Sequence, residues 1–512
     1  MAPLRIGLFL LVCAFFSEAS AGALPSDLKP IHALNRLAYG PRPGDLKRIK
    51  SMGIEQYLKE QLLPESIPLP TGLANRLDGL TTLRLTPVRL FAEYNPPPAG
   101  KKGDPEAAKL AQQRARIVLE EASEARILRA VESPRQLQEV MVNFWFNHFN
   151  VFAGKGLDRL WVGAYEEQAI RPHALGRFRE LLGATAKHPA MLFYLDNWQN
   201  TAPDSRGARG RFKGLNENYA RELMELHTLG VDGGYTQEDV ITLARILTGW
   251  GIRGPKAASS RTGTDGNGFS FDANRHDSGD KGFLGRPIRG SGIAEGEEAL
   301  DILARSPATA RHIAFLLAQY FVADAPPRPL VDRLANRFLE TDGDIRSVLD
   351  ALFHSPEFWD EKAYGQKFKT PYEFVISAVR AAAIEVKNPR PLIGMMQQLG
   401  MPLYGCQTPD GYKNTQEAWL NPSAMTQRVS FATALAGGNL RVNQTPPDGM
   451  SEMTDRAGIP GNRPAAMNPP DPSKLRSTLG DRLSIKTNEA LAVAPARLHA
   501  AMILGNPDFM QR

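Results

Sequence analysis

Two carboxylates stand one helical turn apart near the middle of the chain. The stretch 215–234 reads LNENYARELMELHTLGVDGG, and on a helical wheel Glu222 and Glu225 share one side with Asn218. Neighbouring carboxylates can hold a divalent metal, or can split their pKa values so that one acts as acid and the other as base. We therefore predict Glu222 and Glu225 as catalytic residues, or as metal ligands if a divalent cofactor is used; a solvated helix face is the alternative. Asn218 is a predicted substrate-binding residue, and His227, on the apolar arc, is a further catalytic candidate.

A polar stripe runs through the strongly aromatic segment FWFNHFNVF. The predicted helix 134–149 is apolar nearly all round, which indicates a buried helix. Along one face of it lie Glu139, Asn143, Asn147 and Asn150. Buried amides must be hydrogen-bonded, so the stripe is either a structural network or one wall of a polar pocket. For the pocket we assign Asn143 and Asn147 to substrate binding and His148 to catalysis, and we expect Asn147 and His148 to share hydrogen bonds with the carboxylates of helix 216–229.

Two further stretches carry candidate site residues. Asp196 follows the apolar run HPAMLFYL and is a catalytic candidate, and Arg245 is a cation set within a mostly apolar helix. In the loop RHDSGDKGFLG, Arg275, His276 and Lys281 would suit an anionic group of a substrate, as Arg245 would. For a charged loop, plain solvation is the alternative.

Several function classes have no support in the sequence. It contains no GxSxG, Walker, HExxH, CxxC or dinucleotide-binding motif, and none of its nine histidines pair at i,i+3 or i,i+4. The net charge of +6 is spread without a long basic run, so we expect no nucleic-acid partner. A metal site assembled from distant segments stays open.

The elements that must position these residues are predicted to be helices. Hydrophobic content of 42% and charged content of 23% are typical of a globular protein. Apolar residues recur at helical spacing in 134–149, 160–170, 173–186, 216–229, 236–249, 295–305, 307–323, 328–340, 344–354, 371–387, 413–436 and 488–504. The Gly-rich segment 251–294 is expected to hold a small β-hairpin. The prediction is a mainly α, large multi-helix globular fold with long Gly/Pro-rich loops.

The N-terminus has the order of a secretory signal peptide. Arg5 is followed by an apolar run over residues 6–16 and then by small residues, so we expect cleavage near Ala21 or Ala23. The mature protein would be secreted or periplasmic, without a transmembrane segment. Cys406 would be its one cysteine, and we expect it to be buried.

Composition shifts divide the chain into six expected regions. These are a signal peptide (1–23), an N-terminal helical region (24–94), a linker (95–105), a central helical core with the candidate site (106–437), a Pro/Gly-rich loop (438–487) and a C-terminal helix with a tail (488–512).

Several motifs together resemble a bacterial exported family catalogued as domain of unknown function 1800. They are HALNRLAYGP, NFWFNHFNVF, HPAMLFYLDN, NENYARELMELHTLGVDGGYTQEDV, RHDSGDKGFLG, TDGDIRSVLDALFHSPEFW and TPDGYKNTQEAWL. The resemblance covers nearly the whole mature chain and implies a large, mainly helical, secreted or periplasmic protein. It also implies a neighbouring exported protein that resembles the alkaline phosphatase and sulfatase superfamily. It carries over no catalytic residue.

Two functions from different classes follow. The first is an exported enzyme, a hydrolase in character, that acts on a cell-envelope or extracellular polymer such as a polysaccharide. The second is a non-catalytic binding partner or assembly factor for the neighbouring phosphatase-like protein, with the segment 438–482 wrapping that partner. The sequence leaves open whether the protein is an enzyme.

Overall fold

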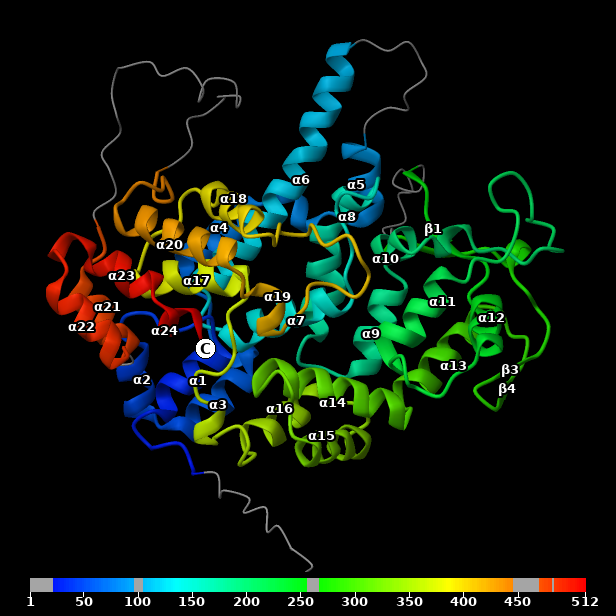
Figure 1. The fold of residues 1–512 in the computed structure, drawn as a ribbon. Helices are drawn as coiled ribbons and strands as arrows, with labels where there is room; N and C mark the ends of the chain where they lie inside the picture. The colour runs from blue at the N-terminus through cyan, green and yellow to red at the C-terminus, as the bar shows by residue number, and fades with distance from the viewer. Residues whose placement is uncertain (1–21, 96–104, 256–266, 445–468, 481–482) are drawn as a thin grey trace, which may run out of the picture.

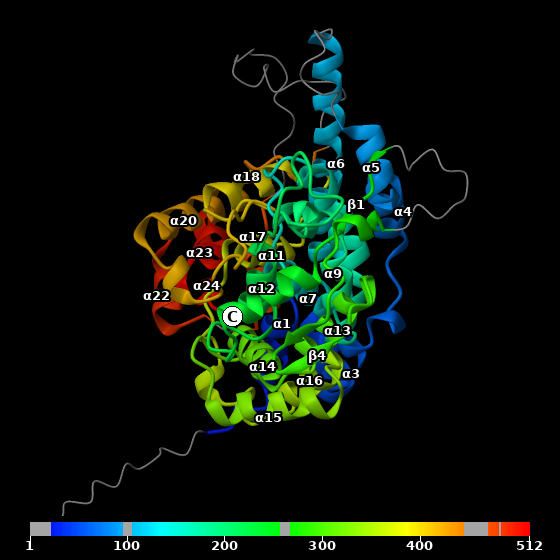
Figure 2. The same cartoon turned by 90° about the vertical axis from the view of Figure 1, so that its right-hand side faces the viewer.

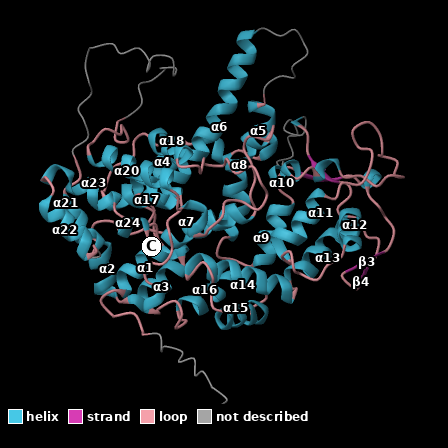
Figure 3. Cartoon of the chain, in the orientation of Figure 1, coloured by secondary structure: helices cyan, strands magenta, loops and turns pink. Residues whose placement is uncertain are grey.

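Helices succeed one another along the chain in the computed structural model, which describes residues 22–95, 105–255, 267–444, 469–480 and 483–512 (Figure 1). The predicted signal peptide, apart from residues 22 and 23, and nearly all of the predicted linker 95–105 lie outside these ranges. Figure 3 shows how little strand the described part contains, which confirms the prediction of a mainly α fold. Within it, no helix combines the length and the apolar character needed to cross a membrane.

Of the N-terminal helices, the first three lie low in Figure 1 and the next two lie higher in the view. They are α1 (Lys29–Leu37), α2 (Asp45–Met52), α3 (Ile54–Leu62), α4 (Thr71–Gly79) and α5 (Pro87–Tyr94). Every residue of α1 from Pro30 to Leu37 is buried, and His32 bonds the Phe358 carbonyl oxygen through Nε2 at 2.9 Å. The N-terminal region therefore packs directly against a segment more than three hundred residues away.

The helix with the polar stripe lies in the interior of the molecule. It is α7 (Gln136–His148), and all its side chains except Gln138 and Asn147 are buried, as the all-round apolar pattern predicts. Around it stand α6 (Pro105–Glu132), α8 (Asp158–Tyr165) with its π-helical continuation Glu166–Ile170, α9 (Phe178–Ala186) and α10 (Pro189–Tyr194). Figure 2 shows α7 enclosed by other helices in the second view as well.

The second predicted wall begins as α11 (Asn218–Glu222) and widens into a π-helical segment, Leu223–Thr228. The next helix, α12 (Gln237–Ile246), starts at the predicted cap: Thr236 and Asp239 bond each other reciprocally. The hairpin expected in 251–294 is present, in a segment with two small antiparallel sheets. They pair β1 (Trp250–Ile252) with β2 (Phe269–Phe271), and β3 (Lys281–Phe283) with β4 (Arg286–Ile288).

The remaining helices close the fold. They are α13 (Ile293–Ala304), α14 (Pro307–Phe321), α15 (Arg328–Glu340), α16 (Ile345–Phe353), α17 (Pro371–Ala381), α18 (Arg390–Gln398), α19 (Gln416–Trp419), α20 (Pro422–Ala436), α21 (Pro472–Leu479), α22 (Ile485–Val493), α23 (His499–Gly505) and α24 (Pro507–Met510). Asp344 caps α16 as expected, accepting from Ser347 N at 2.7 Å.

Three predicted segments differ from the structure: one predicted loop and two predicted helices. The segment 438–487 was expected to be a loop, but it contains α21 and the start of α22. α21 forms because Asp471 caps it and Pro472 occupies its first position, where no backbone donor is needed. The predicted helices 413–436 and 488–504 are each divided, before Pro422 and at Pro495, because the residue preceding a proline disfavours the helical conformation.

The buried side chains form one continuous cluster that runs from Ala33 in α1 to Met510 in α24. Cys406 is among the buried residues, as predicted. The expected N-terminal region, the central segment and the C-terminal helices thus share one core.

Candidate functional site

A cleft of about 230 Å³ opens beside the C-terminal half of α7. We call it the central cleft. Its walls come from α7, the π-helical segment after α11, α14, the start of α17 and the loop 401–414. The residues that line it are Asn143, Phe144, Asn147, His148, Leu226, His312, Leu316, Gln319, Tyr320, Thr370, Glu373, Met401, Asp410, Tyr412, Lys413 and Asn414. An apolar and aromatic surface with a few convergent polar groups is typical of a small-molecule site.

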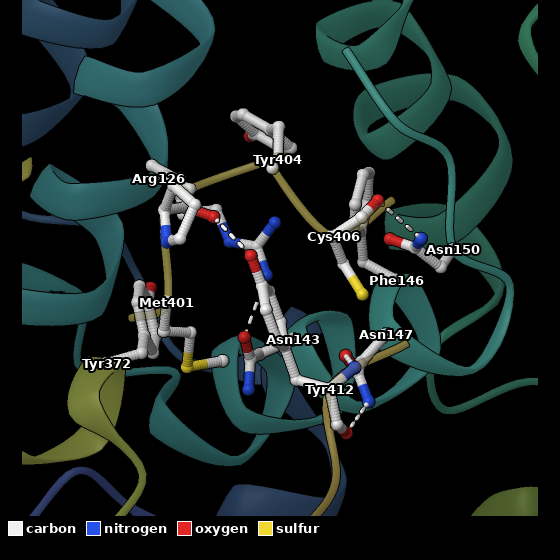
Figure 4. A pocket seen from close by; sticks show the side chains of 13 residues that line it. Arg126, Asn143, Phe146, Asn147, Asn150, Tyr372, Met401, Tyr404, Cys406 and Tyr412 are labelled. Atoms are coloured by element: carbon white, nitrogen blue, oxygen red, sulfur yellow. Dashed lines mark hydrogen bonds between the residues drawn. The ribbon is translucent and has the colours of Figure 1, made fainter. Parts of the chain in front are cut away.

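A small recess, drawn in Figure 4, shares Asn143, Asn147 and Tyr412 with the lining of the cleft. Its free volume of about 20 Å³ has room for about one water molecule. Arg126 and Cys406 line it, so the buried thiol lies beside the site but not in the larger cleft. Burial raises the pKa of Cys406, which makes it a poor nucleophile.

Asn147 joins the loop 401–414 to α7. Its Nδ2 donates to the Tyr412 carbonyl oxygen at 2.8 Å, and its Oδ1 accepts from Tyr412 N, also at 2.8 Å (Figure 4). Asn150 adds two bonds to the same loop, from its Nδ2 to the carbonyl oxygens of Cys406 at 3.0 Å and Thr408 at 2.8 Å. The side-chain amide of Asn147 therefore fastens the loop 401–414, one wall of the cleft, to α7. Its oxygen and its nitrogen are both bonded to the backbone of Tyr412.

Asn143 is oriented by a buried ionic network. Its Oδ1 accepts from Arg126 Nη2 at 2.7 Å, and Arg126 pairs with Glu166 at 3.1 Å. The Tyr404 hydroxyl donates to the same carboxylate at 2.9 Å, and Arg171 links it to Glu139, the first residue of the stripe. Burial opposes the charge of Arg126, but Glu166 outweighs that effect and raises the pKa of the guanidinium. Since Arg126 fixes its oxygen, Asn143 has its NH₂ group left as a donor.

Three histidines gather where α7, α14 and the π-helical segment meet. His148 Nε2 lies 3.1 Å from the His227 carbonyl oxygen, and His312 Nε2 lies 3.2 Å from that of Leu226. These carbonyl groups belong to the last turn of their helix, where no intrahelical partner is present. Because a carbonyl oxygen only accepts, Nε2 of His148 and of His312 carries the hydrogen and Nδ1 keeps a lone pair.

The three imidazoles are held neutral. Burial lowers the pKa of His148 well below its ordinary value, and the neighbouring His227 and His312 lower it further. Burial, with a contribution from His312, lowers the pKa of His227 to about 3, and burial also lowers that of His312. The ring centroid of His148 lies 6.0 Å from that of His227 and 6.2 Å from that of His312. At neutral pH the cleft therefore offers uncharged nitrogen acceptors from His148 and His312, which both line it.

Two carboxyl groups with opposite pKa shifts interact electrostatically: Asp410 lines the cleft, whereas Glu222, on α11, is not among the lining residues. Burial raises the pKa of Glu222, and the charges of Glu225 and Asp410 raise it further against the opposing effect of Arg221. Burial would also raise the pKa of Asp410, but hydrogen bonds from Lys413 and Thr408 outweigh it and the pKa is lowered. Lys413 Nζ lies 2.6 Å from Asp410 Oδ2. Glu222 therefore keeps its proton to higher pH than an ordinary glutamate, and Asp410 is ionised.

A third carboxylate, Glu373, lines the cleft but is fully bonded. It accepts from the Tyr320 hydroxyl and from Arg512 Nη2, both at 3.1 Å, and from Thr370 N at 2.9 Å. In the parts of the chain that the structure describes, no group of three or more His, Cys, Asp or Glu side chains is arranged to hold a metal ion.

The expected hydrogen bonds between Asn147 or His148 and carboxylates of the second wall are not found among the described residues. The two helices do meet, but His148 bonds a backbone carbonyl oxygen and Asn147 bonds the loop around Tyr412. The reason is that the carbonyl groups at the end of the π-helical segment need donors, whereas Glu222 and Glu225 lie on another side of their helix.

Asp196 and Asn218 lie together, outside the lining of the central cleft. Asp196 pairs with Lys155 Nζ at 2.8 Å, and Asn218 Nδ2 donates to the Leu195 carbonyl oxygen at 3.2 Å. Asp196 has a φ of 61°, an uncommon conformation that aspartate tolerates better than most residues. The pair Lys155–Asp196 is one-third exposed, so it forms a separate surface feature.

The four predicted anion-binding residues form hydrogen bonds and ion pairs that stabilise the strand-containing segment. Lys281 Nζ lies 2.6 Å from Glu295 Oε2, and His276 Nε2 lies 2.9 Å from Glu295 Oε1. Arg245 pairs with Asp277 at 2.8 Å, and Arg275 Nη1 donates to the Trp198 carbonyl oxygen at 2.9 Å. The structure brings these residues together with each other, but not with the central cleft.

Sequence reasoning missed several residues of the cleft, chiefly His312, Tyr320, Glu373 and Asp410. His312 and Tyr320 are eight residues apart on α14 and so share a face, but nothing local marks that face as part of a site. Asp410 lies in the motif TPDGYKNTQEAWL, which carried part of the family resemblance, and this was the available signal.

The chain folds as a large, mainly α-helical protein with a cleft beside its central helix α7. The sequence model described as "Protein of unknown function (DUF1800)" matches residues 32–511, nearly the whole chain, and the chain therefore belongs to the DUF1800 family. Searches of curated proteins and of solved structures returned no match.

Proposed function

We propose that the protein is an exported enzyme that hydrolyses a polysaccharide of the cell envelope or its surroundings in the central cleft. Sugar rings present apolar C–H faces and many hydroxyl groups. Phe144, Tyr320 and Tyr412 supply aromatic surface, and Asn143 and the neutral histidines supply donors and acceptors. This mixture of groups suits an uncharged, hydroxyl-rich ligand better than an apolar or strongly anionic one.

The observation that carries the proposal is the pair Glu222 and Asp410. Two carboxyl groups whose surroundings move their pKa values apart have the properties of a general acid and a general base. In the proposed reaction Glu222 donates a proton to the glycosidic oxygen as its bond to the sugar breaks. Asp410 accepts a proton from the water molecule whose oxygen forms the new bond to the sugar carbon.

The test compares Glu222→Gln and Asp410→Asn with Glu238→Gln, an exposed glutamate on α12, as the control. The substrates are purified peptidoglycan and a panel of bacterial exopolysaccharides, and newly formed reducing ends are measured. Both site variants should lose about 10²–10⁴-fold in kcat, the usual contribution of a general acid or base. Their thermal unfolding should match that of the control. Full activity in both variants, or no release from any polymer by the unaltered protein, would rule out the proposal.

A second candidate function is the non-catalytic one, as a binding partner of an exported phosphatase- or sulfatase-like protein. Its support is an exposed apolar surface on α22, where Ile485 is 78% and Val493 is 87% exposed. These residues are eight positions apart and therefore lie on one face. If this face binds the partner, Ile485→Lys with Val493→Lys should abolish a stoichiometric complex on gel filtration, while Glu222→Gln should leave it intact.

A further inference from the structure

A second polar pocket lies at the far end of α7 from the central cleft. It has a volume of about 80 Å³ and sits between α2, α3, α17 and the turn that leads into α7. That volume holds several water molecules, and so one small ion, but is far smaller than the cleft. We call this second pocket the arginine pocket, because Arg42, Arg48 and Arg380 line it.

Positive charge dominates the lining of the arginine pocket. Of the residues that line it, Asp45 is the one carboxylate, so three guanidinium groups stand against one negative charge. Asp45 Oδ2 accepts from Arg42 N at 2.8 Å and lies 3.5 Å from Arg380 Nη2, a long contact. Glu60, outside the lining, pairs with Arg48. Even with Glu60 counted, positive charge remains in excess.

Arg380 is the buried anchor of the pocket. It is 2% exposed, and its Nη1 and Nε donate to the carbonyl oxygens of Val131 at 2.8 Å and Gly40 at 3.2 Å. Those bonds fix the plane of the guanidinium and leave Nη2 with only the long contact to Asp45. Burial lowers the pKa of Arg380 to about 10, so the group is charged at neutral pH and lacks a close anionic partner.

Tyr57 gives an independent indication that a ligand belongs there. Its side chain is 2% exposed and lines the pocket, yet its hydroxyl has no hydrogen-bond partner among the described residues. The hydroxyl oxygen is not among the fully enclosed unbonded atoms, so it faces the pocket, where a ligand can accept its hydrogen. Burial and the charge of Asp45 raise the pKa of Tyr57, so this hydroxyl remains a donor. The nearby Ser133 accepts from Arg135 N at 3.1 Å through its oxygen, and its own hydrogen is free to donate.

The pocket also lies at the N-terminal ends of two helices. Asp45 is the first residue of α2, Gln136 is the first of α7, and both line the pocket. Helix N-termini carry a partial positive charge that favours anions. The arginines, the hydroxyl donors and the helix N-termini thus all favour a negatively charged ligand.

We infer that the arginine pocket binds a small tetrahedral oxyanion, phosphate or sulfate, held by Arg42, Arg48 and Arg380 and by the Tyr57 hydroxyl. Arginine forks match the oxygen spacing of such ions, and a tetrahedral ion can accept from donors on several sides. The bound ion would join α2, α3 and α17 to the start of α7. This inference is independent of the hydrolytic function, since no residue of the central cleft takes part.

The experiment titrates the full-length exported protein, purified without phosphate or sulfate, by calorimetry and by thermal unfolding at constant ionic strength set with chloride. The probes are inorganic phosphate, inorganic sulfate, glycerol phosphate and acetate. The expected result is one phosphate or sulfate per chain, with a concentration-dependent rise in melting temperature. Equal or tighter binding of glycerol phosphate would identify the ligand as a phosphate group on a larger molecule, and its exclusion would identify the free ion.

The variants Tyr57→Phe and Arg42→Gln should each weaken phosphate binding about tenfold, the loss expected for one hydrogen bond to a charged group. Neither should unfold the protein, since the Tyr57 hydroxyl has no described partner and Arg42 is exposed. The control is Arg89→Gln, an exposed arginine that pairs with Glu93 elsewhere on the surface. The inference is wrong if no probe binds at millimolar concentrations, if acetate binds more tightly than phosphate and sulfate, or if both variants bind phosphate as the control does.

Discussion

At the scale of single residues, His227 is buried without a hydrogen-bond partner for either ring nitrogen among the described residues. An imidazole always carries at least one N–H group, and burying that group unbonded costs about 1–3 kcal/mol. The protonated form is disfavoured still more, as the pKa of about 3 shows. His227 thus lowers the stability of the fold, while its backbone carbonyl group orients His148.

The first prediction is that His227→Leu stabilises the protein in acid. The folded pKa of about 3 lies below the value of about 6.5 for a free histidine, so between these values the unfolded chain binds a proton that the folded chain does not. The contribution of His227 to the free energy of unfolding therefore falls by about 1.4 kcal/mol for each pH unit below about 6.5. His227→Leu removes this contribution and should gain about 2 kcal/mol at pH 5 relative to pH 7.5.

Urea unfolding at the two pH values measures the effect of His227→Leu. The control is His173→Leu, at a partly exposed histidine outside the cluster of three. An equally steep loss of stability in acid for His227→Leu and for the unaltered protein would contradict the assignment of a buried neutral imidazole.

At the scale of elements, the shape of the cleft depends on how the loop 401–414 is tied to α7. Asn147 supplies both a donor and an acceptor to the backbone of Tyr412, as a neighbouring strand would. The two residues are 265 positions apart in the sequence. Without this pairing the loop that carries Asp410 would have fewer contacts to the helix that carries His148.

The second prediction concerns Asn147→Ala. It should lower the free energy of unfolding by about 2 kcal/mol, since two hydrogen bonds of about 1 kcal/mol each are lost. It should also speed hydrogen exchange at the Tyr412 amide, which loses its acceptor. Asn388→Ala, which removes one exposed turn bond to Arg390 N, is the control. If Tyr412 exchanges no faster in Asn147→Ala than in the control, Asn147 does not hold the loop.

Much of the element structure was predictable from local patterns. The all-round apolar segment gave a buried helix at α7, and Thr236 with Asp239 formed the expected cap of α12. The errors came where a proline signal was outweighed by apolar periodicity, as at Pro422 and Pro495, or where a short capped helix, α21, stood inside a Pro-rich stretch. Local steric rules decide these points, and the signals for them were present in the sequence.

At the scale of the whole molecule, the described N-terminus is attached to a distant part of the chain. Leu24 N donates to the Trp359 carbonyl oxygen at 2.7 Å, and Glu361 N donates to that of Gly22 at 3.0 Å. Ala23 and Asp360 form an isolated bridge between these two bonds. The backbone of residues 22–24 therefore belongs to the folded structure.

The third prediction follows for the expected signal peptide. Of the two predicted cleavage positions, cleavage after Ala21 preserves the Gly22 bond, whereas cleavage after Ala23 removes it. N-terminal sequencing of the protein from the periplasm or medium of its host should therefore begin at Gly22. A mature chain that begins at Leu24 would show that the Gly22 bond is dispensable, and an uncleaved chain retained in the cytoplasm would contradict export.

The sequence by itself determined the helical class, the small hairpins, the buried stripe on α7 and the family. Each of these depends on residues close together in the chain, through helical periodicity, capping and turn chemistry. The tertiary structure alone decided which polar groups remain free for a ligand. Arg275, His276 and Lys281 found partners within their own segment, Asn147 was bonded by Tyr412, and Asp410 came to lie near Glu222. Which groups become hydrogen-bond partners depends on how segments far apart in the sequence pack together. Residue types and their spacing along the chain do not specify the distances between such segments.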